Sequence, residues 1–206
     1  MNTDKKIIRR EALKRMGFAV MSGAIASSGL LSLASCETKR SKRIIFYFTG
    51  TGNSLYIARQ LAGENAELLS IPQMVKRGKY EFEADEIGIV YPIYGHMPPY
   101  MVRQFIQKAK LKAEYKFAVL TYGARKRDAV EIWDRISRKA DNAFDYINTI
   151  IMVDNWLPNF DMNEQLKIDK HNPENLQKIT ADINSRKNWH APETEEELQQ
   201  HPGYIQ

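Results

Sequence analysis

A loop rich in glycine and hydroxyl side chains follows the first strongly apolar run of the folded part of the sequence. It reads Thr49-Gly50-Thr51-Gly52-Asn53-Ser54 and comes directly after the stretch 43–48. In a strand-to-helix loop of this kind, backbone N–H groups and the positive end of the helix converge on one point, which suits a phosphate group. The hydroxyls add donors, and the glycines let the backbone approach a ligand closely. We therefore expect these six residues to bind a phosphate.

Two other phosphate-binding motifs do not match this loop. The Walker motif of nucleotide triphosphatases needs a lysine before its last hydroxyl residue, where this chain has Asn53. The dinucleotide fingerprint needs a third small residue, where this chain has Leu55. Both differences favour a single phosphate monoester over a triphosphate or a dinucleotide.

Two later segments could contact the rest of such a ligand. The stretches 91–99 and 121–124 each follow a predicted strand, and open α/β sheets bind ligands at the carboxyl ends of their strands. Tyr94 is the best candidate for stacking on a flat ring, because an aromatic face suits such a ring and excludes water. Tyr122 and Trp156 could do the same or could belong to ordinary packing.

The histidines point to no metal site. His171, His190 and His201 lack the spacing of metal ligands, and we expect no bound metal. His96 could influence the protonation of a bound ligand, but an exposed loop histidine is the expectation.

The glycine-rich loop after a first strand resembles the phosphate loop of flavodoxins, which hold the phosphate of flavin mononucleotide (FMN) without a basic side chain. Further segments, Pro-Ile-Tyr-Gly at 92–95, Thr-Tyr-Gly at 121–123 and Asp-Asn-Trp-Leu-Pro at 154–158, resemble the flavodoxin half of bacterial flavodoxin–ferredoxin fusion proteins. The resemblance covers about residues 43–186. It implies FMN as cofactor, with its ring between the second and third segments and the Gly95 peptide near N5. The implied cofactor-binding residues are Thr49, Gly50, Thr51, Gly52, Asn53, Ser54, Pro92, Ile93, Tyr94, Gly95, Thr121, Tyr122 and Gly123.

Cysteine usage separates this chain from those fusion proteins. Cys36 is the only cysteine, so the ferredoxin ligands are missing. We expect electron transfer to a separate redox partner protein or a small donor or acceptor. Two alternatives stay open: an FMN-dependent reductase that uses NAD(P)H or a quinone, and a lipoprotein that keeps the fold without flavin. No residue is assigned a catalytic role.

Alternating strand and helix patterns must position these loops. Apolar, β-branched and aromatic runs predict strands at 43–48, 67–70, 86–91, 116–122 and 146–153, and helical spacing predicts helices at 53–63, 99–110, 127–139 and 173–186. The alternation indicates an α/β domain with a mostly parallel sheet covered on both faces. The resemblance implies a flavodoxin-like doubly wound sandwich with a five-stranded parallel sheet in the order 2-1-3-4-5.

The first 35 residues have the layout of a secretory signal, with a basic stretch, an apolar run and a small-residue end. Arg9-Arg10 with the following Leu13 and Lys14 resembles a twin-arginine motif, and Leu33-Ala34-Ser35-Cys36 resembles a lipobox. We expect a signal peptide over 1–35, lipidation of Cys36, and a tether over 36–42. The protein would then be an exported lipoprotein, anchored by lipid to a membrane on the periplasmic side of the bacterial cell envelope.

Charge and composition complete the domain organisation. Six of the 30 basic residues and two of the 25 acidic residues lie in 1–35, so the remaining chain is near neutral and gives no reason to expect nucleic-acid binding. The polar composition of 187–206 predicts a C-terminal tail that follows the FMN-binding domain at 43–186.

Overall fold

The computed structural model describes residues 43–64, 66–155 and 160–199. The expected signal peptide, the lipidation site at Cys36, the tether and Trp156 lie outside these described residues.

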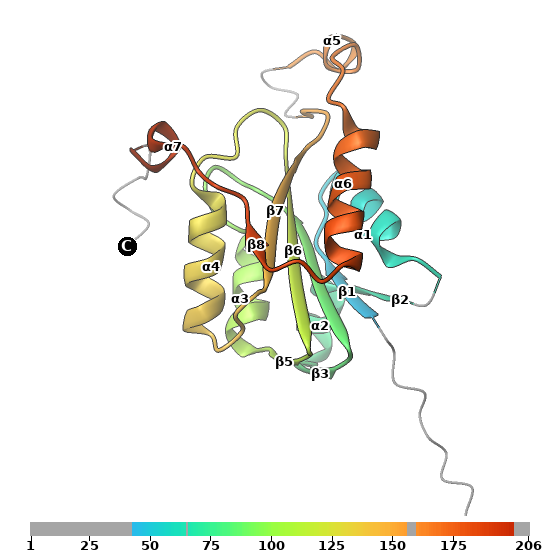
Figure 1. Cartoon of the computed structure of the whole chain (residues 1–206), viewed down its shortest axis with the longest axis vertical. Coiled ribbons are helices and arrows are strands. Elements are labelled where there is room, and N and C mark those ends of the chain that lie inside the picture. The colour runs from blue at the N-terminus through green and yellow to red at the C-terminus, as the bar shows by residue number, and fades with distance from the viewer. Residues whose placement is uncertain (1–42, 65, 156–159, 200–206) are drawn as a thin grey trace, which may run out of the picture. The chain divides into compact units, whose positions relative to one another are not determined.

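The domain is built on a parallel sheet with the strand order β2-β1-β4-β6-β7-β8 (Figure 1). Every neighbouring pair in it runs parallel. Its strands are β1 (Arg43–Tyr47), β2 (Ala66–Ser70), β4 (Glu86–Pro92), β6 (Tyr115–Tyr122), β7 (Tyr146–Ile151) and β8 (Trp189–His190).

The expectation of a five-stranded sheet in the order 2-1-3-4-5 was wrong. The main sheet has six strands, and β3 (Glu81–Glu83) and β5 (Lys110–Lys112) form a second, two-stranded sheet, so the order differs. The sixth strand, β8, comes from the segment expected to be a tail, because Trp189 pairs with Tyr146 of β7. The five longer strands, β2-β1-β4-β6-β7, are arranged as in a flavodoxin-like α/β fold.

Helices cover both faces of the sheet (Figure 1). The helices α2 (Ile71–Arg77), α3 (Tyr100–Lys108) and α4 (Ala129–Lys139) pack on one face, while α1 (Asn53–Ala62) and α6 (Asn172–Asn184) pack on the other. Two short helices, α5 (Met162–Gln165) and α7 (Glu195–Gln199), lie beyond the carboxyl ends of the strands.

The continuous apolar sequence of the central strands follows from this two-sided cover. In β1, Ile44 and Phe46 face the core under α2, α3 and α4, whereas Ile45 faces the core under α1 and α6. All three are buried, and each buried side chain of this size contributes about 2 kcal/mol to folding. The two cores thus hold the strand ends, and the loops after them, in place.

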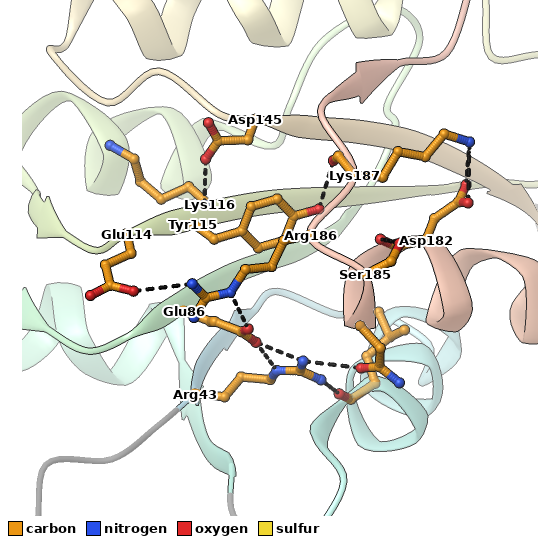
Figure 2. A network of polar contacts seen from close by, with 12 residues as sticks. Arg43, Glu86, Glu114, Tyr115, Lys116, Asp145, Asp182, Ser185, Arg186 and Lys187 are labelled. Atoms are coloured by element: carbon orange, nitrogen blue, oxygen red, sulfur yellow. Dashed lines mark hydrogen bonds and ion pairs between the residues drawn. The ribbon is translucent and has the colours of Figure 1, made fainter.

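The amino ends of the strands are closed by a network of ion pairs (Figure 2). Arg43 Nη2 lies 2.6 Å from Glu86 Oε2, and Arg186 Nε donates to the other oxygen of Glu86 at 3.0 Å. Arg186 also pairs with Glu114 at 3.0 Å. The network joins the starts of β1 and β4 to the end of α6.

The segment 187–199 packs onto the domain. Trp189 N donates to Asp145 O at 2.9 Å, and Ala191 N donates to Ile147 O at 2.8 Å. Beyond β8, Lys126 Nζ binds Glu197 Oε2 at 2.7 Å, which attaches α7 to the loop before α4. No helix in the described part of the chain is long and apolar enough to cross a lipid bilayer.

Candidate functional site

A cleft of about 1060 Å³ opens at the carboxyl ends of the strands. The loops after β1, β4, β6 and β7 line it. From β1 the chain continues to β2 on one side of it and then crosses to β4 on the other side. The cleft therefore lies where the strand order of the sheet reverses direction. Open α/β sheets bind their ligands at this position.

The cleft brings together nearly all of the residues that the sequence proposes for a cofactor. The exception is Gly52, which belongs to the same loop but does not line the cleft. Those that line it are Thr49, Gly50, Thr51, Asn53, Ser54, Pro92, Ile93, Tyr94, Gly95, Thr121, Tyr122 and Gly123.

The loop 49–54 leaves several donors at the start of α1. Gly52 is the N-cap residue with a φ of 104°, and no side chain caps the helix. Its N–H donates to Thr49 Oγ1 at 2.9 Å. A hydroxyl that accepts a hydrogen bond keeps its own proton to donate, so Thr49 can still bind an anion. Glycine is required at position 52 because the left-handed backbone region disfavours other residues.

Three side-chain contacts attach this loop to its neighbours. Ser54 Oγ and Thr121 Oγ1 are 2.8 Å apart and buried, which ties the start of α1 to the end of β6. Asn53 Nδ2 donates to Val153 O at 3.0 Å. Asn155 Nδ2 donates to Thr51 Oγ1, so the segment after β7 supports the loop from the other side.

Tyr94 stands over the glycine-rich loop with much of its ring in solvent. The side chain is 54% exposed, and its ring makes a T-shaped contact with the ring of Phe48, with the centroids 6.5 Å apart. A Cβ atom at position 50 would lie 2.9 Å from the Tyr94 hydroxyl, so glycine there lets the end of this side chain lie close over the loop. An exposed aromatic face beside a cleft is suited to stacking on a flat ligand.

Tyr94 begins a tight turn in which Tyr94 N donates to Met97 O at 3.0 Å and Met97 N donates to Tyr94 O at 3.2 Å. Gly95 has a φ of 68° at the second position of the turn, while His96 at the third has a negative φ, the signs of a type II′ turn. The turn presents the Gly95 peptide to the cleft.

The opposite side of the cleft is formed by the loop after β6. A Cβ atom at Gly123 would lie 2.5 Å from the Asp154 side chain, so glycine allows the loops after β6 and β7 to meet. Burial, with a smaller contribution from Glu197, raises the pKa of Tyr122. Its hydroxyl is therefore protonated at neutral pH.

Some lining residues were not singled out from the sequence. Arg125, Arg127 and Phe160 line the cleft, and so do Asp154 and Asn155, which the sequence indicated only as part of a longer resemblance. No local sequence pattern marks Arg125 or Arg127 as a lining residue. Arg127 falls in the predicted helix at 127–139, whereas α4 begins two residues later, at Ala129.

The expectation of an exposed loop histidine at position 96 was wrong. His96 is only 6% exposed, since its ring is enclosed by Asp128 and Arg127 of the loop before α4. Asp128 is completely buried. Nowhere in the described residues do three His, Cys, Asp or Glu side chains lie in a group that could hold a metal ion.

No protein-family model matches the chain, and neither does any curated protein. Among solved structures it is similar to two-electron reduced flavodoxin from Megasphaera elsdenii, with 18% identity, 52% of this chain and 84% of that chain covered, and a TM-score of 0.41. It is also similar to a flavoprotein in complex with FMN from Lactobacillus acidophilus, with 12% identity and a TM-score of 0.40. That match covers 53% of this chain and 93% of the flavoprotein. A third similar structure is the Trp repressor binding protein from Bacillus subtilis, with 10% identity to this chain and a TM-score of 0.44. That match covers 68% of this chain and 98% of the Bacillus protein. Because these three TM-scores are below 0.5, the fold assignment rests on the strand order of the sheet and not on these similarities.

Proposed function

We propose that this chain is a flavodoxin-like redox protein that binds FMN in the cleft at the carboxyl ends of β1, β4 and β6. The single observation that carries the proposal is the meeting, in one cleft, of an uncharged phosphate-type loop with two loops suited to a flat ring. The phosphate would lie at 49–54, and the ring between the turn at Tyr94 and the loop at Tyr122.

The donors of the loop fit a phosphate monoester. Thr49 and Thr51 accept hydrogen bonds from Gly52 N and Asn155 Nδ2, which leaves the proton of each hydroxyl for a ligand. The start of α1 adds backbone N–H groups and the positive end of a ten-residue helix. Donors of this kind bind a dianionic phosphate without a lysine or arginine in the loop.

The remainder of the cleft fits a flat, partly polar ring. Tyr94 offers an exposed aromatic face, and Ile93 and Val153 add apolar lining. The volume of about 1060 Å³ is slightly above the range of about 300–1,000 Å³ that is typical of small-molecule sites, which is enough for a mononucleotide.

When bound, FMN supplies one- and two-electron redox chemistry, and the protein sets its potential. The residues of this chain bind the phosphate, hold the ring between two loops and shield it from water. The Gly95 peptide lies in a turn at the cleft and is the backbone group that we propose meets N5 of the ring.

We propose further that the protein is exported and anchored by lipid at Cys36, as a carrier that serves a separate redox partner. The support is in the sequence: the paired arginines at 9 and 10, the lipobox-like 33–36, and a single cysteine in the chain. Mass spectrometry of the protein purified from membranes tests the anchor. A diacylglyceryl mass on a fragment that begins at Cys36 is expected, and an unmodified Cys36 would overturn it.

The flavin proposal is tested by purifying the full chain, recording its visible spectrum after incubation with FMN, and identifying the flavin released on denaturation. A bound flavin spectrum and a released mass equal to FMN are expected. An unchanged spectrum of free flavin, with none retained after gel filtration, would contradict the proposal. Rapid consumption of NADH or NADPH by the loaded protein alone would favour a reductase over a carrier.

A further inference from the structure

A buried polar cluster joins the two loops on either side of the proposed ring site. His96 comes from the turn after β4, whereas Arg127 and Asp128 come from the loop after β6. His96 Nδ1 contacts Asp128 Oδ1, and Arg127 Nη1 lies 3.2 Å from His96 Nε2. His96 is 6% exposed and Asp128 is 0% exposed, so the cluster is closed to solvent on the histidine side.

The chemistry of the partners assigns the proton on the imidazole. A guanidinium group can only donate hydrogen bonds, so His96 Nε2 must accept from Arg127. The proton of a neutral ring then sits on Nδ1, where it is donated to the carboxylate of Asp128. Nδ1 of His96 thus donates to Asp128, and Nε2 accepts from Arg127. Asp128 fixes the orientation of the imidazole ring, and the ring fixes the position of the guanidinium.

Asp128 faces His96, and a different acidic residue accepts hydrogen bonds from the first backbone N–H groups of α4. It is the N-cap residue of α4, yet its side chain makes no capping hydrogen bond. Glu193 Oε1, from the segment after β8, accepts from Val130 N at 2.9 Å and from Glu131 N at 3.1 Å instead. The helix cap is therefore supplied by a residue distant in sequence, and the N-cap aspartate is turned toward the histidine.

Arg127 is the member of the cluster that reaches the cleft. It lines the cleft, whereas His96 and Asp128 do not. Its backbone has a φ of 51°, a left-handed conformation that costs a residue with a side chain about 1 kcal/mol. Among the described residues, the charged residues that line the cleft are Arg125, Arg127 and Asp154, while the buried carboxylate of Asp128 lies behind His96 and does not line it.

We propose that His96 is a positioning residue that acts through Arg127, and that the guanidinium it holds at the cleft stabilises bound FMN in its anionic two-electron-reduced form relative to the oxidised form. This inference rests on the proposed function. Addition of two electrons and one proton to the flavin ring leaves one negative charge on it, and an opposite charge at the site favours the charged form. The oxidised ring is uncharged and gains less from the arginine.

The measurement is the ratio of the dissociation constants of oxidised and reduced FMN, obtained from fluorescence titration and from the midpoint potential of bound FMN under dithionite reduction. In Arg127→Gln we expect this ratio to fall about tenfold, which for a two-electron couple lowers the midpoint potential by about 30 mV. His96→Asn retains an amide N–H for Asp128, but its shorter side chain removes Nε2, the atom that accepts from Arg127. It should lower the ratio in the same direction, at least about threefold if the guanidinium loses most of its fixed position.

The double variant decides whether the histidine acts through the arginine. If it does, His96→Asn adds nothing once Arg127 is glutamine, and the two effects are not additive. Lys139→Gln, at the far end of α4, removes the same charge from an exposed position and should leave the ratio at its wild-type value. Additive effects, an unchanged ratio in either single variant, or an equal change in Lys139→Gln would each overturn the inference.

Thermal unfolding shows whether each variant is folded. If His96→Asn is not, Arg127→Lys replaces it, because lysine keeps the charge but lacks the forked donors that fit the imidazole. A ratio between those of wild type and Arg127→Gln is expected, and a wild-type ratio would contradict the positioning role.

Failure of the wild-type protein to bind FMN would overturn the proposed function and this inference together. Binding by wild type with an unchanged ratio in Arg127→Gln would overturn only the inference.

Discussion

The two ends of the sheet satisfy their polar groups in opposite ways. At the amino ends, charges of both signs meet in one network, in which Glu86 binds two arginines and is 14% exposed. At the carboxyl ends, hydroxyls, amides and glycine backbone predominate, and they are arranged around an open cleft. The charges of the ion-pair network are paired with one another, whereas hydroxyls that accept within the protein still have protons to donate to a ligand. The comparison assigns stability to one end and binding to the other.

The largest effect is expected at the carboxyl end, from replacing the hydroxyls of the phosphate loop. The double change Thr49→Val and Thr51→Val removes two donors while nearly preserving shape. Hydrogen bonds to a charged group are worth about 2 kcal/mol each, so we expect FMN binding to weaken on the order of a hundredfold or more. Fluorescence titration measures it. Thermal stability without ligand should fall only slightly, because the hydrogen bonds that the two hydroxyls accept from Gly52 N and Asn155 Nδ2 are exposed to solvent. Undiminished affinity would remove the phosphate role of the loop.

Glu86→Gln, at the amino end, is expected to lower stability and to leave FMN binding unchanged. This change removes the carboxylate that Arg43 and Arg186 share. Arg43 and Glu86 are only 16% and 14% exposed, so the unfolding free energy should fall by about 2 kcal/mol. FMN affinity should stay at the wild-type value. Chemical denaturation provides the measurement.

An exposed ion pair supplies the matched control for that change. Glu81 and Lys110 are 2.8 Å apart but 75% and 79% exposed. Glu81→Gln should therefore leave the unfolding free energy nearly unchanged. Equal losses in the two variants, or a loss of FMN affinity in Glu86→Gln, would break the division between the two ends.

A smaller effect is expected from Gly95→Ala. The φ of 68° at this position costs an alanine about 1 kcal/mol, and the added methyl group restricts the peptide that faces the cleft. We expect the two one-electron reduction potentials of bound FMN to move closer together, with a loss of stability of about 1 kcal/mol. Spectroelectrochemical titration separates the two steps. Potentials that keep their wild-type separation would exclude a role for this peptide.

The smallest expected effect is a pH dependence in the attachment of α7. Partial burial acts to raise the pKa of Glu197, but the hydrogen bond and charge of Lys126, with hydrogen bonds from Thr194, hold it below the ordinary value. A lowered carboxyl pKa stabilises the attached state above the unfolded pKa of about 4.3, and this contribution is lost as pH falls below it.

Hydrogen exchange of residues 194–199 measures this attachment. Protection should be lower at pH 4 than at pH 7, and Glu197→Gln should show less of that difference. The change should be below about 1 kcal/mol, because the pair is only partly buried. Equal pH dependence in the variant would mean that another group is responsible.

Much of the fold could be read from the sequence because it depends on local signals. The apolar run at 43–48 and the glycine-rich loop after it identify the first strand and its turn, since both depend on side chains that lie next to one another in the chain. The sixth strand could not be read in this way. Trp189 and His190 form a strand only by pairing with β7, a contact made across more than forty residues.

The same distinction holds for the site. The loops after β1, β4 and β6 contain recognisable glycine and aromatic patterns, and the structure brings them to one cleft. The cluster of His96, Arg127 and Asp128 has no pattern, because it depends on the side-by-side placement of β4 and β6. Asp128 with Glu131 three residues later does have the spacing of a helix start, which marks the beginning of α4 at Ala129 better than the apolar periodicity alone.

The most direct test of the proposed function compares the affinity of the full chain for FMN and for riboflavin, which lacks the phosphate. If the loop 49–54 binds the phosphate with hydroxyl and backbone donors, FMN should bind at least about a hundredfold more tightly, and the double threonine variant should lose most of that preference. Equal affinities for the two flavins, or no binding of either, would contradict the assignment of this loop.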